Sequence, residues 1–334
     1  MESLELFTTS PQSRNCSQQG YLKRVAEVAR WSEEFGYSGI LVYTDNGIVD
    51  PWLVAQIILQ STERLSPLVA IQPVYMHPYT VAKMVTSLAF LHHRRVYLNM
   101  LAGGFKNDLL ALNDSTPHDQ RYQRTTEYTL IIRKLLETSG PVTFEGSHYR
   151  IKNLKMQPSL SPDLFPGFLI SGSSAAGMEA VRALGATAVK YPGPDDADKE
   201  QWDGSGDGIR RGIRVGIVAR PHHEDAWAVA RERFPVDRRG QITHQFAMKT
   251  SDSFWHRQLS AAGEREAESV YWLEPFRNYH TFCPYLVGRY DETGAELARY
   301  IKKGVRTFIL DIPPSSDELE HARQVFDRAL EAAT

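Results

Sequence analysis

The sequence predicts an α/β fold of the (β/α)8 TIM-barrel class. Short apolar segments rich in β-branched residues alternate with longer segments of helical period, a pattern typical of parallel β-α units. Eight strand candidates follow this rhythm, and a chain of 334 residues can form such a barrel as one domain, residues 1–334. A doubly wound open sheet is the competing architecture. The predicted strands are Leu4–Thr8, Gly39–Tyr43, Leu68–Ile71, Val96–Met100, Phe168–Ile170, Ala186–Lys190, Ile213–Ala219 and Thr307–Asp311.

Helices are predicted between these strands, and glycines mark where several of them end. Gly36 and Gly185 each stand just past a periodic apolar run. A helix often ends at such a residue in the left-handed αL conformation, which glycine adopts readily. A strand begins a few residues later in both cases. The predicted helices are Tyr21–Phe35, Val81–His92, Thr125–Thr138, Ala175–Leu184, Asp225–Phe234, Gly294–Lys303 and Glu318–Ala332.

Two segments interrupt the alternation. Pro192–Arg211 is polar and glycine-rich, and Gln241–Gly288 precedes the last helix and strand. The second segment is too long for an ordinary connection, and it is rich in aromatic residues. We therefore predict a lid insertion over residues 241–288, before the last strand.

Composition excludes several classes of function. A formal net charge of −2 and the lack of long basic runs argue against nucleic acid as a partner. Cys16 and Cys283 are the only cysteines, too few for a disulfide framework or a zinc cluster, and no histidine pair has metal-ligand spacing, so we expect no metal. The start MESLELFTTS lacks the pattern of a signal peptide, and no apolar run is long enough to cross a membrane. We expect a cytoplasmic protein with no membrane partner.

The turn after the fifth predicted strand is the most informative candidate site. Functional groups of a barrel collect at the C-terminal ends of its strands. There, Ser171, Gly172, Ser173 and Ser174 lead from a strand into a helix, which is a typical cradle for a phosphate group. The alternative is that a serine merely caps the helix. Because GxGxxG and a Walker lysine are both absent, a mononucleotide phosphate is favoured.

Other polar or small residues follow neighbouring strands. Tyr122 lies in a polar cluster that is either a second phosphate contact or a solvated helix face. Asn99 and the small turn at Ala102 would allow a flat ring to approach the backbone, although such glycine-rich turns are often only turns. His77 follows the third strand and either lines the pocket or caps a helix.

With these residues in view, the chain resembles the bacterial-luciferase-like flavin-dependent oxidoreductases, closest to the alkanesulfonate monooxygenase branch. The likeness spans nearly the whole chain and rests on the order and spacing of short motifs. These are Gly36-Tyr37-Ser38-Gly39, Asp50-Pro51-Trp52-Leu53-Val54-Ala55, Thr80-Val81-Ala82-Lys83, Asn99-Met100-Leu101-Ala102-Gly103-Gly104, Arg121-Tyr122 with Glu127, Gly172-Ser173-Ser174, and Gly212-Ile213-Arg214 with Asp225-Ala226-Trp227.

The resemblance implies a two-component monooxygenase. Such an enzyme receives FMN as FMNH2 from a separate NAD(P)H:flavin reductase, forms a flavin C4a-(hydro)peroxide with O2 and oxygenates a small organic substrate. It also implies a homodimer or homotetramer and a mobile lid. A deazaflavin-dependent oxidoreductase that transfers hydride, and a non-catalytic flavin-binding relative, are the alternatives.

The resemblance also assigns residues. FMN phosphate would lie against Gly172, Ser173 and Ser174 beside Tyr122, and the isoalloxazine would lie against Asn99 and Ala102. Arg214 matches a catalytic arginine of the sulfonate enzymes, and Arg277 falls near their lid arginine. Three pocket positions differ from that branch, Ile48, Gly216 and Ile312, and His77 is a further pocket candidate. The more apolar periphery favours a bulkier or carrier-bound specialised metabolite over a simple alkanesulfonate.

Overall fold

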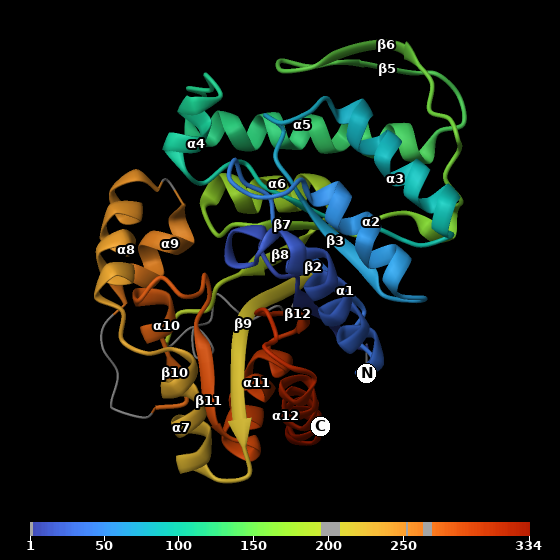
Figure 1. Ribbon diagram of the computed structural model, residues 1–334. Coiled ribbons are helices and arrows are strands. Elements are labelled where there is room, and N and C mark those ends of the chain that lie inside the picture. The colour runs from blue at the N-terminus through green and yellow to red at the C-terminus, as the bar shows by residue number, and fades with distance from the viewer. Residues whose placement is uncertain (1–2, 195–207, 252, 263–268) are drawn as a thin grey trace.

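The computed structural model describes residues 3–194, 208–251, 253–262 and 269–334, and its centre is a closed barrel of eight parallel strands (Figure 1). The strands are β1 (Glu5–Thr9), β2 (Gly39–Val42), β3 (Ser66–Ile71), β4 (Tyr97–Met100), β7 (Phe168–Ser171), β8 (Thr187–Lys190), β9 (Arg211–Arg220) and β12 (Val305–Leu310). β9 pairs with both β8 and β12, and this double pairing closes the barrel. The barrel prediction is confirmed in all eight strands, and the open sheet is excluded.

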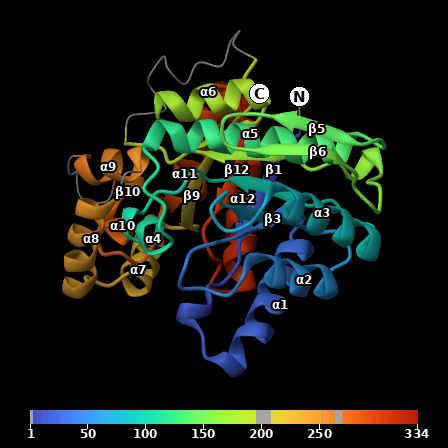
Figure 2. The ribbon, with the colours of Figure 1, turned by 90° about the horizontal axis from the view of Figure 1, so that it is seen from above.

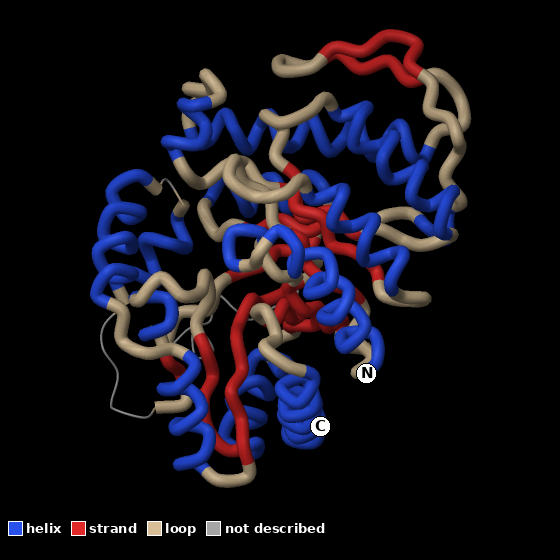
Figure 3. Tube along the Cα trace, viewed as in Figure 1, coloured by secondary structure: helices blue, strands red, loops and turns tan. Residues whose placement is uncertain are grey.

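Helices surround this barrel, as Figures 2 and 3 show. They are α1 (Gln18–Glu34), α2 (Pro51–Ser61), α3 (Pro78–His92), α5 (His118–Glu137), α6 (Ala175–Leu184), α7 (His223–Arg233), α11 (Tyr290–Lys302) and α12 (Ser316–Ala333). Gly185 ends α6 in the left-handed conformation, at φ 57°, as its position predicts. α2 was not predicted, although its start carries two sequence signals of a helix. Asp50 accepts a hydrogen bond from the Trp52 N–H, and Pro51 occupies the first turn.

The rest of the described chain forms short elements outside the barrel. Two 3-10 helices (Ser13–Asn15 and Pro162–Leu164) and α4 (Lys106–Ala111) lie in loops. A hairpin of β5 (Val142–Glu145) and β6 (Arg150–Leu154) follows α5. None of the described helices is long and apolar enough to cross a membrane.

The segment predicted as a lid contains helices and also extends the sheet. Its described part holds α8 (Arg238–Thr250), α9 (Phe254–Ala261), β10 (Tyr271–Trp272), α10 (Glu274–Arg277) and β11 (Tyr285–Arg289). β11 runs parallel to the second half of β9, which projects beyond the barrel, and β10 pairs antiparallel with β11. Residues 252 and 263–268 of this segment, and 195–207 of the glycine-rich segment, lie outside the described residues.

The interior of the barrel is filled by one apolar cluster. Its buried members come from seven strands: Phe7, Leu41, Leu68, Tyr97, Leu169, Val189 and Ile309. Phe7 and Tyr97 meet edge to face with 5.1 Å between ring centroids. Because these side chains fill the inside of the barrel, a ligand has to bind at the end of the barrel.

Candidate active site

A cavity opens at the C-terminal end of the strands. Its walls include Gln12, Tyr43, Gln72, Asn99, Ala102, Tyr122, Gly172, Ser173 and Arg214, together with Ser253, Phe254, Trp255 and Phe282 from the predicted lid segment. Six of the residues predicted to be catalytic or to bind the cofactor therefore lie in one cavity: Asn99, Ala102, Tyr122, Gly172, Ser173 and Arg214. Their roles toward a ligand remain predictions.

The structure shows the helix-cap alternative at the turn before α6, and the phosphate cradle at the same turn stays a prediction. Ser174 is the N-cap, and its Oγ accepts a hydrogen bond from the Gly177 N–H at 3.1 Å. That cap satisfies one first-turn donor, and the other first-turn N–H groups have no partner within the helix. A helix start with such donors favours an anion.

Gly172 contributes room rather than a donor. Its N–H already donates to the Val189 carbonyl at 3.3 Å. A Cβ at this position would lie 2.5 Å from the Tyr122 hydroxyl oxygen, so any side chain would push into the cradle. Burial raises the pKa of Tyr122, which keeps its phenol protonated as a hydrogen-bond donor.

The neighbouring strand β4 contributes the adjoining part of the wall. Asn99 is 5% exposed, and its Oδ1 accepts a hydrogen bond from the Ser171 hydroxyl at 3.0 Å. The following turn passes through Gly103 at φ 92°, a conformation that favours glycine. Ala102 lines the cavity in this turn, as expected for a wall that a planar ring approaches.

Arg214 supplies a buried cation. It is 3% exposed, and its guanidinium carbon lies 4.7 Å from the ring centroid of Tyr43 and 5.8 Å from that of Tyr191. Its Nη2 is 3.8 Å from Oδ1 of Asp311. Among the described residues neither its Nε nor its Nη2, both buried, has a hydrogen-bond partner, so the guanidinium retains donor capacity that an anion could use.

Aromatic residues that the sequence reasoning missed form part of the wall. Tyr43 and Tyr191 follow β2 and β8, so their place at strand ends was the signal that could have identified them. Trp255, at the start of α9, stacks on Tyr191 with 3.9 Å between centroids and 13° between planes. This stack joins the predicted lid segment to the barrel wall.

Ile48 and His77 lie outside this cavity. Ile48 lines a neighbouring hollow that shares Thr44 and Gln72 with it. His77 is exposed and caps α3, its Nδ1 accepting a hydrogen bond from the Tyr79 N–H at 3.2 Å. The capping alternative for His77 is therefore the one that the geometry supports.

Gly216 and Ile312 line a separate hollow beside β9 and β12, together with Tyr285. Their assignment to the substrate pocket has no support in this geometry. Arg277 also lies outside the main cavity. Its guanidinium donates to Glu274 at 3.0 Å and to the Ala262 carbonyl at 2.7 Å, so its predicted role would require movement of the lid segment.

No group of three histidine, cysteine, aspartate or glutamate side chains in the described ranges could hold a metal ion. The cavity combines the start of α6, which favours an anion, with the buried cation Arg214. A large flat ligand carrying a phosphate fits that arrangement.

Comparison with known proteins identifies the class. The family model for luciferase-like monooxygenases matches residues 1–307, and the chain belongs to this family of enzymes. It is 35% identical over 312 residues to the 4-(gamma-L-glutamylamino)butanoyl-[BtrI acyl-carrier protein] monooxygenase BtrO of Niallia circulans, covering 91% of each chain.

Solved structures share the fold. The riboflavin lyase RcaE, crystallised with modified FMN and riboflavin, matches with a TM-score of 0.74 at 16% identity and covers 100% of this chain and 93% of its own. An F420-dependent secondary alcohol dehydrogenase matches with a TM-score of 0.68 at 14% identity, covering 98% and 99%. These two matches support the barrel and do not separate the two kinds of cofactor.

Proposed function

We propose that this enzyme is a two-component FMN-dependent monooxygenase. It would take reduced FMN from a separate NAD(P)H:flavin reductase and use O2 to oxygenate a small specialised metabolite held on a carrier protein. The observation that carries this proposal is the presence, within one cavity, of the turn at Gly172 that leads into α6 and of the buried cation Arg214.

The residues present fit FMN. The helix start and the protonated Tyr122 hydroxyl would hold its phosphate, and Asn99 with Ala102 would border its ring. When bound, reduced FMN supplies the electrons with which one oxygen atom of O2 enters the substrate and the other leaves as water.

The chain itself would supply orientation and electrostatics. Arg214 presents a fixed positive charge where negative charge develops during oxygen transfer, in surroundings of low polarity. The stacked Trp255 and Tyr191 rings keep water from the reacting atoms.

The carrier-bound substrate is proposed from the similarity to BtrO, which is named as a monooxygenase of an acyl group on a carrier protein. An alkanesulfonate substrate has less support, because the relative that is 35% identical is named for an acyl group on a carrier protein. Ile48, Gly216 and Ile312, which differ from that branch, lie outside the main cavity and so do not bear on the substrate. We expect no sulfite release from short alkanesulfonates at a normal turnover rate. Such release would show that the enzyme acts as an alkanesulfonate monooxygenase.

We also propose a homodimer or a homotetramer. Three large apolar side chains on α2 and α3 are exposed: Leu53 at 64%, Phe90 at 75% and Leu91 at 67%. Exposed apolar groups of this size commonly mark an interface. Light scattering on the purified protein would refute the proposal by showing a monomer.

The test of the function is an anaerobic fluorescence titration with FMN, FMNH2 and the deazaflavin coenzyme. It is followed by mixing with air-saturated buffer while oxygen uptake is recorded. Preference for FMNH2, with oxygen uptake that depends on an added carrier-bound acyl substrate, is the expected result. Failure to bind reduced FMN would overturn the proposal.

A deazaflavin-dependent hydride transfer is the second candidate. It is favoured by the structural likeness to the F420-dependent alcohol dehydrogenase. Preference for the deazaflavin in the same titration, without oxygen uptake, would establish it.

A further inference from the structure

A buried chain of three side chains connects Arg214 to a strand outside the barrel. Nη2 of Arg214 lies 3.8 Å from Oδ1 of Asp311. The other carboxylate oxygen of Asp311 accepts a hydrogen bond of 2.9 Å from the Tyr285 hydroxyl. The Arg214 and Asp311 side chains are 4% and 9% exposed, and Tyr285 is 3% exposed, so water contributes little to holding any of them.

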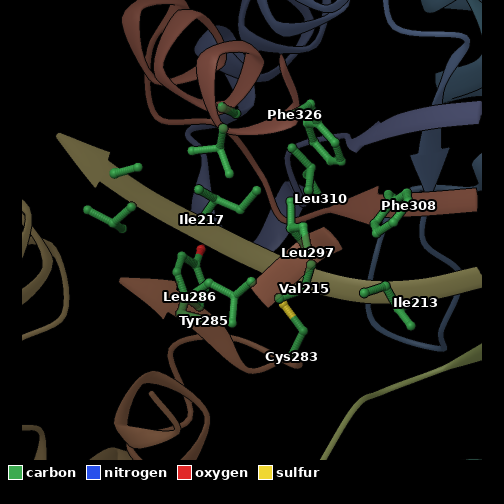
Figure 4. Packing of buried hydrophobic residues seen from close by; sticks show 14 of the residues in the cluster. Ile213, Val215, Ile217, Cys283, Tyr285, Leu286, Leu297, Phe308, Leu310 and Phe326 are labelled. Carbon is green, nitrogen blue, oxygen red and sulfur yellow. The ribbon is translucent and has the colours of Figure 1, made fainter. Parts of the chain in front are cut away.

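The position of Tyr285 depends on a glycine in the neighbouring strand. Tyr285 in β11 stands opposite Gly216 in β9, and the Gly216 N–H donates to the Pro284 carbonyl at 2.8 Å. A Cβ on Gly216 would lie 2.2 Å from Cζ of the Tyr285 ring. Figure 4 shows Tyr285 lying against β9 among the buried side chains there. Gly216 therefore provides the space for the tyrosine ring.

The contacts of Arg214 alone do not fix its guanidinium. The ion pair with Asp311 is long, the rings of Tyr43 and Tyr191 lie beside the guanidinium, and its further partner, the Cys283 thiol, forms only a weak hydrogen bond. A poorly hydrated carboxylate with no other partner would draw the guanidinium into a close bidentate pair. The hydroxyl of Tyr285 satisfies one carboxylate oxygen, and this limits that attraction.

We infer that Tyr285 is a positioning residue that acts through Asp311 to keep the N–H groups of Arg214 directed at the cavity. The inference rests on the proposed function, since it assumes that Arg214 serves the reaction. Tyr285 itself does not line the cavity, so it would affect the reaction without touching flavin or substrate.

The first test compares two buried tyrosines. Tyr285→Phe removes the hydroxyl that Asp311 accepts, and the matched control Tyr128→Phe removes an equally buried hydroxyl whose 2.9 Å bond goes to the Met76 carbonyl. We expect Tyr285→Phe to lower kcat by roughly tenfold, as for the loss of a hydrogen bond to a charged group, with the Kd for reduced FMN and the KM little changed. Tyr128→Phe should leave kcat unchanged. Equal losses in both variants would overturn the inference.

The second test asks whether Tyr285 acts through Arg214. In an Arg214→Ala background Tyr285→Phe should lower kcat no further, because the group that it positions is gone. Losses that multiply in the double variant would show an independent structural role. Gly216→Ala is a second way to displace the ring and should reproduce the kcat loss of Tyr285→Phe.

The third test needs neither flavin nor turnover. Crystal structures of the flavin-free wild type and the flavin-free Tyr285→Phe variant are compared. In the variant, and not in the wild type, the guanidinium of Arg214 should have moved from its place beside Tyr43 toward Asp311. An unmoved guanidinium would refute the positioning role. If the wild type binds no reduced FMN, the proposed function fails, and this comparison still decides whether Tyr285 places Arg214.

Discussion

Gly172→Ala tests the phosphate cradle at its tightest point. The added Cβ would lie 2.5 Å from the Tyr122 hydroxyl oxygen, which would have to withdraw by about 1 Å to restore ordinary contact. Overpacking of this kind costs about 1–3 kcal/mol in unfolding free energy. The same shift takes the hydroxyl from the proposed phosphate position, so we expect the Kd for reduced FMN to rise by roughly 10- to 100-fold.

Tyr122→Phe is the matched partner for this experiment. With the hydroxyl absent, the nearest atom of the Tyr122 ring would be Cζ, 3.5 Å from the new Cβ, which is ordinary contact. Gly172→Ala should therefore cost almost nothing in the Tyr122→Phe background, as measured by urea unfolding of the flavin-free proteins. Fluorescence titration gives the flavin affinities. An equal unfolding cost of Gly172→Ala in both backgrounds would refute the account of the cradle.

Two further predictions concern charge. Arg214→Ala should reduce turnover far more than it reduces FMN affinity, and an unchanged rate in steady-state assays would remove Arg214 from the site. Burial, and then the neighbouring His244, lower the pKa of His256 to about 4, whereas an unfolded histidine titrates near 6.5. Unfolding free energy should therefore fall between about pH 6.5 and 4, by on the order of 3 kcal/mol from this group. His256→Phe should remove that part of the pH dependence in urea titrations, and an identical dependence in the variant would contradict the assignment.

The barrel could be predicted from sequence because its signals are local. Each strand is a short apolar run, and several helices end at a glycine such as Gly185. β11 could not be predicted in this way, because Tyr285–Arg289 forms a strand only against the projecting half of β9, far away in sequence. The β5–β6 hairpin is largely exposed, so it lacks a buried face to reveal it.

The site was predictable where a residue stands at the end of a barrel strand, as Asn99 and Gly172 do. The prediction of Gly216 as a pocket residue shows what a local pattern misses. This glycine lies two residues after Arg214 and so on the same face of β9, but beyond the barrel that face is covered by Tyr285. Which partner covers a strand face is a long-range property that no local pattern encodes.

The continuous strand β9 has a consequence for engineering. Its first half forms the barrel wall that carries Arg214, and its second half pairs with β11. Exchanging residues 241–288 as one block with a relative would therefore replace Tyr285 and disturb the setting of Arg214. A graft confined to α8 and α9 would exchange the residues of the cavity wall around Trp255 and leave β11 in place. The useful crossover point for chimeric enzymes lies between α9 and β10, within the segment rather than at its ends.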